Sequence, residues 1–427
     1  MAVVTIVGGQ WGDEGKGKIV DLLAEKADMV IRYSGGDNAG HTVINPYGEF
    51  KLHLICSGIF HKGTTCILGN GVAINPAVLL QEIEEMKQKK VDTANLYISD
   101  RAHLIMPYHI LLDRLEEERR GGAAIGTTLK GIGPVFTDKT ARLGIRTCDL
   151  LNEKIFKARL QEVLELKNAL ITRVYGASPL SFEDIYRQYL DYGKKLSPFI
   201  RETGIIIRDA INNNKTILLE GAQGTMLDPD FGTYPYVTSS SPLASSSSTG
   251  SGISINQINH VVGIFKAYIT RVGGGPMPTE LKDDIGEFIR KRANEYGATT
   301  GRPRRCGWFD IVAGRFSIRV NGFTGIVLTR LDILDTLPEI KICTGYKIQD
   351  KVIDYFPTDL ATLEKCQPVY EHLPGWKSST SEIREFKNLP AEAKRYIARL
   401  EELLSCRIDI VSVGAKREQT VTIRPII

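Results

Sequence analysis

Six short apolar runs constrain the fold of this chain more than any other feature of its sequence. Each run ends in glycine or polar residues, and the runs cover Val3–Val7, Met29–Ile31, Ile67–Leu68, Ile217–Leu219, Ile326–Leu328 and Ile408–Val411. A strand that is apolar without alternation is buried on both faces, which is typical of parallel sheets covered by helices. The sequence therefore predicts an α/β fold with a mainly parallel central sheet flanked by helices.

Two segments between these runs have the spacing of packed helices. They are Pro76–Lys87 and Asn259–Ile269, and both place apolar residues at helical intervals. The chain contains neither an internal repeat nor a long linker rich in proline or charge. We therefore expect residues 1–427 to form a single α/β unit that carries inserted subdomains.

Composition excludes several classes of protein. Glycine makes up 41 of 427 residues, about 10% against a usual share of about 7%, but without the Gly-X-Y period of a fibre. Lys and Arg total 54 against 50 Asp and Glu, so a protein that coats polyanions is disfavoured while a local phosphate site stays open. Seven scattered cysteines without a C-x-x-C pair indicate reduced thiols. With no secretory leader or long apolar segment, we expect a cytoplasmic protein.

One stretch of low complexity, Thr238–Gly252, is rich in serine. Its composition favours a flexible surface linker. The alternative is a hydroxyl-rich loop that binds phosphate.

A glycine-rich loop follows the first predicted strand. Residues 8–18 read GGQWGDEGKGK, and a helical pattern comes next. Gly12, Gly17 and Lys18 match the G-x-x-x-x-G-K phosphate loop, whose backbone N–H groups surround phosphate oxygens at a helix N-terminus. A glycine-rich chain can match this motif by chance, but the order strand, loop, helix is what the motif requires. The sequence thus predicts a P-loop-like nucleotide-binding core.

The phosphate loop departs from the usual pattern at two positions. Ile19 stands where the Ser or Thr that binds magnesium is usual, so another group must hold the metal. Asp13 is an acid inside a loop that attracts anions, which makes it a candidate for magnesium binding, for general base catalysis, or for both.

A second glycine-rich turn follows the second predicted strand. Residues 35–42 read GGDNAGHT. A lone histidine is usually structural, but His41 lies in a polar loop without an apolar face. We therefore favour a catalytic or phosphate-contacting role for His41.

These two loops together resemble the signature of the adenylosuccinate synthetases. Further blocks match that family in order, at residues 125–128 (IGTT), 131–134 (GIGP), 220–225 (EGAQGT), 232–240 (GTYPYVTSS), 270–273 (TRVG), 297–302 (GATTGR), 331–332 (LD) and 412–414 (SVG). The resemblance covers essentially the whole chain. It implies a GTP-dependent ligase of purine (AMP) biosynthesis that joins IMP and L-aspartate to adenylosuccinate, with a helical insertion near residues 100–210 and a guanine-pocket region near residues 326–427.

The resemblance also implies a two-step mechanism with Asp13, His41, Lys16 and Gln223 as catalytic residues. Asp13 removes the N1 proton of IMP, so that O6 attacks the γ-phosphate of GTP and forms 6-phosphoryl-IMP. One Mg²⁺ per subunit is bound by the Asp13 carboxylate and the Gly40 carbonyl, and the aspartate amine then displaces phosphate.

Three binding sites follow from the same resemblance. The implied GTP site consists of Gly12, Asp13, Glu14, Gly15, Lys16, Gly17, Lys18, Gly40, His41, Thr42, Arg304, Arg330, Leu331, Asp332, Ser412, Val413 and Gly414. The implied IMP site consists of Asp13, Glu14, Gly15, Lys16, Asn38, Ala39, Gly40, His41, Thr128, Arg142, Gln223, Thr238, Val272 and Arg302, with Arg142 reaching the partner's IMP across a homodimer. The implied aspartate site consists of Thr299, Thr300, Gly301, Arg302, Pro303, Arg304 and Arg305.

Two residues depart from the family pattern. Pro303 replaces a further arginine found in some members and should stiffen the aspartate loop. Arg330 stands where the family usually has lysine, and a stacked site does not treat the two alike.

Asp332 should recognise guanine, because its carboxylate can accept from N1–H and the 2-amino group.

Two other functions remain as alternatives. One is another P-loop GTPase or nucleotide phosphotransferase, against which Ile19 and Asp13 argue. The other is an RNA-binding protein that uses Arg302–Arg305, against which the near-neutral charge and the lack of interleaved aromatic residues argue. We expect neither a nucleic-acid nor a membrane partner.

Overall fold

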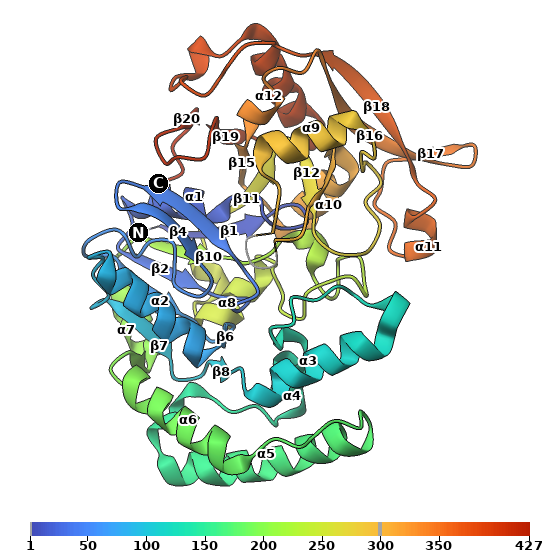
Figure 1. Ribbon diagram of the computed structural model, residues 1–427. Helices are drawn as coiled ribbons and strands as arrows, with labels where there is room; N and C mark the ends of the chain where they lie inside the picture. The colour runs from blue at the N-terminus through green and yellow to red at the C-terminus, as the bar shows by residue number, and fades with distance from the viewer. Residues whose placement is uncertain (1, 298–300) are drawn as a thin grey trace.

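A ten-stranded sheet forms the centre of the molecule (Figure 1). The computed structural model describes residues 2–297 and 301–427. The strand order is β20-β19-β15-β11-β1-β10-β2-β5-β7-β9, and every neighbouring pair is parallel except β19 and β20. The strands are β1 (Val3–Gly8), β2 (Met29–Arg32), β5 (Thr65–Leu68), β7 (Leu96–Ser99), β9 (Ile200–Arg201), β10 (Ile217–Glu220), β11 (His260–Lys266), β15 (Gly325–Thr329), β19 (Ile408–Ser412) and β20 (Thr420–Thr422).

All six apolar runs are strands of this sheet, which confirms the predicted parallel α/β fold. β1, β2, β10, β15 and β19 are buried along their whole length. Full burial of one Val, Leu or Ile side chain stabilises a fold by about 1.5–3 kcal/mol. Three apolar clusters pack on the sheet, two mainly with strands of the N-terminal half and one mainly with strands of the C-terminal half.

Helices cover both faces of the sheet and extend the molecule at both ends (Figure 1). Apart from the four helices named next, the α-helices are α1 (Lys16–Ala24), α2 (Pro76–Gln88), α7 (Thr203–Asn212), α8 (Ser245–Ser251), α9 (Asp284–Ala293), α10 (Ile311–Asn321), α11 (Leu360–Leu363) and α12 (Ala391–Leu404). A helical layer below the sheet in Figure 1 consists of α3 (Pro107–Arg120), α4 (Ile132–Ala141), α5 (Glu153–Arg173) and α6 (Phe182–Leu196). None of the described helices combines the length and apolar character that a bilayer span requires.

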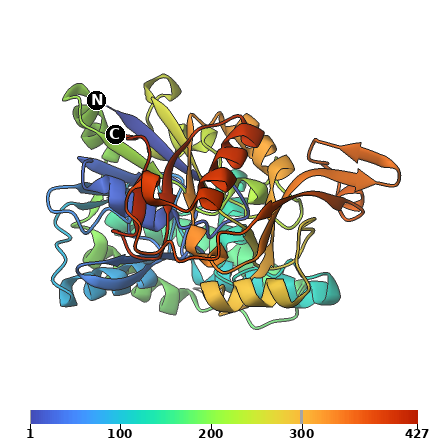
Figure 2. The same cartoon turned by 90° about the horizontal axis from the view of Figure 1, so that it is seen from above.

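Smaller strands and short helices complete the fold. The strands are β3 (His41–Asn45), β4 (Gly48–Leu52), β6 (Ala73–Ile74), β8 (His103–Leu104), β12 (Ile269–Arg271), β13 (Arg305–Gly307), β14 (Phe309–Asp310), β16 (Glu339–Ile348), β17 (Lys351–Ile353) and β18 (Gln367–Pro374). The 3-10 helices are η1 (Gly121–Ala123), η2 (Thr147–Leu151), η3 (Thr225–Leu227), η4 (Ile255–Gln257), η5 (Leu331–Leu334) and η6 (Phe386–Asn388). β16, β17 and β18 form an antiparallel ribbon, whose orange tip protrudes from the body in Figure 2.

The two predicted helices have different outcomes. Pro76–Lys87 is confirmed as α2, whose Asn75 cap accepts from the amide of Val78. The helix predicted at Asn259–Ile269 is wrong, because His260–Lys266 is β11, hydrogen-bonded between β1 and β15. Both predictions used apolar spacing, and spacing alone does not separate a strand buried on both faces from a buried helix.

The serine-rich segment is packed, and only its second part, Ser245–Ser251, is the helix α8, so the flexible linker favoured by its composition is wrong. Ser247 and Ser251 of α8 are buried, and the Ser247 hydroxyl lies 3.4 Å from that of Thr5 on β1. Gly250 packs so close that a Cβ atom there would lie 2.1 Å from the carbonyl oxygen of Tyr33. Small side chains thus let this helix approach the backbone that follows β2.

Replacing Gly250 tests this close packing. We expect Gly250→Ala to lower the free energy of unfolding by about 1–3 kcal/mol, because the added methyl group must displace backbone. The neighbouring exposed position provides the control, and Thr249→Ala should change the free energy by less than about 0.5 kcal/mol. Chemical denaturation of both variants measures the difference. Equal stability of the two variants would contradict the packed helix.

Candidate functional site

A large cleft lies at the carboxyl ends of the central strands. Its volume is about 1770 Å³, and it extends from the sheet to the helices α3, α4 and α5. Of the residues expected to bind substrates, its wall contains Gly12, Asp13, Gly15, Lys16, Gly17, Asn38, Ala39, Gly40, His41, Thr42, Thr128, Gln223, Thr238, Val272, Gly301, Arg302, Arg304 and Arg330. Parallel strands place their following loops at one edge of a sheet, which is why segments so distant in sequence meet here.

The loop after β1 has the backbone geometry of a phosphate site. Gly12 and Gly15 adopt φ of 88° and 89°, and Asp13 between them adopts φ of 59°. These left-handed conformations turn the chain tightly before α1 begins at Lys16. The N-terminal amides of α1 therefore face the cleft, where they favour an anion.

Glu14 closes this loop from inside. Its buried carboxylate accepts from the amides of Gln10 and Gly12 at 3.0 and 2.9 Å. The same carboxylate accepts from the Lys16 Nζ at 2.7 Å, and that Nζ also donates to the Gln223 carbonyl at 2.5 Å. The Glu14 side chain is thus engaged within the loop, and Glu14 lies outside the cleft wall.

Lys18, the lysine of the matched motif, points away from the cleft. Its Nζ donates to Ser412 Oγ at 2.6 Å and to the carbonyls of Gly414 and Gln419 at 2.9 and 2.8 Å. Burial lowers the pKa of this ammonium to about 7. Lys18 therefore ties α1 to the segment after β19, and the motif correctly predicts the loop without predicting the place of its lysine.

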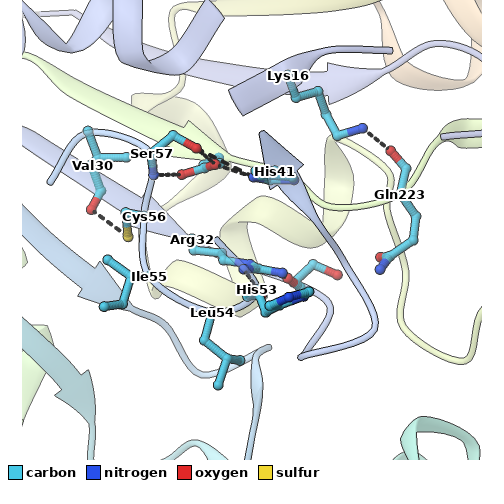
Figure 3. Close-up of polar contacts among 12 residues, drawn as sticks. Lys16, Val30, Arg32, His41, His53, Leu54, Ile55, Cys56, Ser57 and Gln223 are labelled. Carbon is cyan, nitrogen blue, oxygen red and sulfur yellow. Dashed lines mark hydrogen bonds and ion pairs between the residues drawn. The ribbon is translucent and has the colours of Figure 1, made fainter. Parts of the chain in front are cut away.

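His41 is held by a buried carboxylate at the end of β10. The Nδ1 of His41 donates to Glu220 Oε1 at 2.7 Å (Figure 3). The Ser57 hydroxyl and amide donate to the same carboxylate at 2.6 and 2.9 Å. The contact between Nδ1 and Glu220 assigns the proton to Nδ1 and leaves Nε2 as the second ring nitrogen for a ligand.

Both pKa values of this pair lie below their ordinary values. Burial lowers the pKa of His41, although Glu220 opposes this effect. Burial by itself would raise the pKa of Glu220, but the hydrogen bonds from His41 and Ser57 and the charge of Arg32 lower it. At neutral pH an ionised Glu220 therefore faces a neutral His41 imidazole.

Asp13 takes part in a chain of charges. Arg304 Nε donates to Asp13 Oδ2 at 2.7 Å, and Arg304 also donates to Glu295 Oε2 at 2.6 Å. Glu295 is buried and accepts from Lys266 Nζ at 2.7 Å. Burial opposes ionisation of Glu295, but Lys266 and Arg304 outweigh it and lower its pKa to about 2. The guanidinium of Arg304 is thus held between Glu295 and Asp13, and Asp13 is the exposed end of this chain of charges.

Further polar side chains line the cleft. Gln223, with φ of 55°, donates from Nε2 to Asn38 Oδ1 at 3.2 Å. The Thr238 hydroxyl lies 3.3 Å from that of Ser240. Arg302 donates to the carbonyls of Gly126 and Thr127 at 2.9 and 3.3 Å. These contacts bring the expected IMP residues together around one part of the cleft.

The expected guanine residues lie beside the cleft rather than on its wall. They are Leu331, Asp332, Ser412, Val413 and Gly414, and Ala415 next to them reaches the wall. Asp332 Oδ1 is buried and has no hydrogen-bond partner in the described structure. Burial raises the pKa of this carboxyl, which Arg330 opposes. An orphaned carboxylate oxygen is what a donor from a base could satisfy.

Several expected residues lie elsewhere. Arg142 is the left-handed C-cap of α4, outside the cleft wall. The guanidinium of Arg305 pairs with Glu280 at 2.8 and 2.6 Å, so it anchors β13 rather than facing a ligand. Pro303 is also off the wall. Thr299 and Thr300 lie outside the described residues.

Sequence reasoning did not assign roles to Glu220, Ser57 or Glu295. Glu220 and Ser57 are separated by 163 residues, so only the fold brings them together. The sequence contains one signal for Glu220, which is its position at the end of an apolar strand. An acid buried there needs hydrogen-bond or charge partners.

Comparison with known proteins supports the family resemblance over nearly the whole chain. The model of the family "Adenylosuccinate synthetase" matches residues 5–421. The adenylosuccinate synthetase of Dehalococcoides mccartyi is 58% identical over 99% of this chain and 100% of its own length, and that of Pelotomaculum thermopropionicum is 53% identical over 99% of both. The structure of the fully ligated adenylosuccinate synthetase from Plasmodium falciparum is similar, with a TM-score of 0.94 and 38% identity over 99% of this chain and 100% of that one.

Removing the charge of Glu220 should move the titration of His41. Because the carboxylate stabilises the imidazolium, we expect the pKa of His41 in Glu220→Gln to fall by roughly 1 to 3, so that the ring stays neutral to lower pH. NMR of the imidazole carbon-bound protons against pH measures this change. Ser57→Ala retains the carboxylate and should leave the pKa near its wild-type value. An unchanged or raised pKa in Glu220→Gln would contradict the pairing.

Proposed function

The chain belongs to the adenylosuccinate synthetase family, and we propose that the cleft described above is its active site. The enzyme is a ligase that forms a C–N bond, joining IMP and L-aspartate to adenylosuccinate in AMP biosynthesis with conversion of GTP to GDP and phosphate. One observation carries the assignment of the site: the phosphate loop after β1 and the Asn38–Thr42 loop face the same cleft in a chain matched over its length.

In the proposed first step, O6 of IMP attacks the γ-phosphate of GTP. Asp13 accepts the N1 proton, the O6–phosphorus bond forms, and the bond to the β-phosphate oxygen breaks, which gives 6-phosphoryl-IMP and GDP. Phosphoryl transfer depends mainly on positioning and charge stabilisation. Lys16 and the N-terminus of α1 provide positive charge beside the phosphates.

His41 would act on the β-phosphate of GDP, which is the leaving group of the first step. His41 lines the cleft and its Nδ1 is held by Glu220, so Nε2 would be the nitrogen that meets a phosphate. Anionic phosphates raise the proton affinity of an imidazole beside them, and Glu220 stabilises the imidazolium that forms. His41 then donates to the β-phosphate of GDP as charge develops there.

In the proposed second step, the amine of L-aspartate attacks C6 and phosphate leaves. The two substrate carboxylates require cations, which Arg302 and Arg304 supply from the cleft wall. Arg305 is engaged with Glu280, so we assign it to holding the segment rather than to binding aspartate directly. Gln223 and Asn38, which are hydrogen-bonded to each other, would contact the base of IMP.

The side chains of the cleft fit a magnesium ion that arrives with its nucleotide. Among the described residues, no group of three or more His, Cys, Asp or Glu side chains forms a metal cluster. Mg²⁺ usually retains several waters and binds through one or two carboxylates plus substrate phosphates. Asp13 and the Gly40 carbonyl, both on the wall, would hold it. When bound, the ion would neutralise phosphate charge.

We also propose a cytoplasmic homodimer in which Arg142 reaches the partner's IMP. The position of Arg142 at the end of α4, outside its own cleft wall, supports a contact made elsewhere. The seven cysteines are free thiols, which supports a reducing compartment. Residues 1–427 would act as one synthetase unit with the insertion near residues 100–210 and the guanine region near residues 326–427.

The alternatives are less well supported. A GTPase or nucleotide phosphotransferase normally uses the hydroxyl that Ile19 lacks. An RNA-binding role for the Arg302–Arg305 segment conflicts with the pairing of Arg305 with Glu280.

Omitting each substrate in turn tests the reaction. We expect GDP to form over many turnovers only when IMP, L-aspartate and GTP are all present. Adenylosuccinate should then appear in the same amount as GDP. Asp13→Asn should reduce turnover by roughly a hundredfold or more, since general base catalysis contributes about that much, while thermal unfolding stays cooperative. GTP hydrolysis that is indifferent to IMP would contradict the synthetase assignment.

Replacing Asp332 tests guanine recognition. We expect Asp332→Asn to reduce the preference for GTP over ATP by roughly tenfold or more, because the amide cannot accept two donors from guanine. The ratio of kcat/KM for the two nucleotides measures the preference. Asp350→Asn, an exposed change in the same region of sequence, serves as the control. An unchanged ratio in Asp332→Asn would move guanine recognition to other residues.

A further inference from the structure

The loop between α3 and α4, which presents Thr128 to the cleft, contains three residues in the left-handed region, and one of them is not glycine. Gly126, Leu129 and Gly131 adopt φ of 82°, 57° and 76°. Leu129 carries a Cβ atom and is therefore strained in the left-handed region. Something outside the loop must hold this backbone in place.

Two acids on one face of α3 hold it. Glu117 accepts from three consecutive amides, those of Ile125, Gly126 and Thr127, at 3.1, 2.7 and 3.1 Å. Asp113, four residues earlier, accepts from the Thr127 hydroxyl and the Gly131 amide, both at 2.9 Å. Residues four apart lie on the same helix face, so the two carboxylates act on the loop from one side.

The carbonyls of the loop face the other way. Gly126 and Thr127 accept from Arg302, which lies on the cleft wall. The loop is thus bound on its amide side by acids and on its carbonyl side by a cation. Within the described residues, the amide and hydroxyl of Thr128 take no part in these contacts, and Thr128 lines the cleft.

We propose that Glu117 and Asp113 are positioning residues that pre-form the Thr128 loop for the phosphate of IMP. The proposal rests on the proposed IMP site, of which the resemblance makes Thr128 a member; because its amide and hydroxyl are both donors, we assign them to the anionic group of IMP, its phosphate. By accepting from the flanking amides, the carboxylates keep those amides turned to α3 and leave the Thr128 donors turned to the cleft. Both acids also line the cleft, but their negative charge is satisfied by five donors, so it opposes a phosphate at Thr128 only weakly.

The two acids differ in what an amide replacement would do. At Glu117 all three partners are backbone N–H donors. In Glu117→Gln the side-chain NH₂ is itself a donor, so it would face an N–H group and hydrogen bonds to the loop would be lost. At Asp113 one partner is a hydroxyl, which can turn and accept from the NH₂ of Asn. The geometry therefore predicts a large effect for Glu117→Gln and a small one for Asp113→Asn.

Steady-state kinetics of the full-length enzyme test the proposal. Glu117→Gln should raise KM for IMP roughly tenfold to hundredfold, with KM for GTP changed less than about twofold. Asp113→Asn should stay within about threefold of wild type, whereas Asp113→Ala, which leaves two donors without an acceptor, should follow Glu117→Gln. Glu118→Gln is the matched control, because that neighbouring carboxylate is 63% exposed and has an ion pair with Arg114.

A second readout separates positioning from general stability. Binding of inosine, which lacks the phosphate, should be unchanged in Glu117→Gln while binding of IMP is weakened. Equal weakening of inosine and IMP, or KM values for IMP and GTP that rise together, would overturn the proposal. So would a wild-type KM for IMP in Glu117→Gln and Asp113→Ala. If wild-type turnover does not require IMP at all, the proposed function fails instead, and the two failures are distinguishable.

Discussion

The buried carboxylate of Glu220 is the charge on which the architecture of the cleft depends. It ends a central strand, is inaccessible to water, and is stable as an anion because His41 and Ser57 donate to it and Arg32 lies close by. These partners belong to the end of β2, the start of β3 and the segment after β4. Satisfying one buried charge therefore fixes three separate parts of the chain at the carboxyl edge of the sheet, together with the orientation of a histidine that faces the cleft.

The same principle extends across the site, where acids hold cations before any substrate arrives. Glu14 holds Lys16, and Glu295 holds Arg304 and Lys266. A site for two nucleotides and a dicarboxylic amino acid must concentrate positive charge, and isolated cations at such density would repel one another. Pairing at the charged end of each side chain keeps the cations in place, so little reorganisation is needed when phosphate charge moves.

The sequence allowed the sheet and the ligand loops to be predicted because both have local signatures. Apolar runs indicate buried strands, and glycines at fixed spacing indicate a phosphate loop. The errors arise where packing decides the outcome. β11 has helical spacing but is flanked by two strands, and the serine-rich segment has the composition of a linker but packs against Tyr33. Lys18 points away from the cleft for a similar reason, since its acceptors lie 394 or more residues away in sequence.

The central claim is that the cleft phosphorylates O6 of IMP before the C–N bond forms. IMP labelled with ¹⁸O at C6 tests it directly. If O6 attacks the γ-phosphate of GTP and leaves with it when aspartate adds, every phosphate released carries one ¹⁸O atom, and mass spectrometry of the phosphate detects it. Phosphate that contains only oxygen from GTP and solvent would contradict the account, because the γ-phosphate would then have been transferred to water and not to the base.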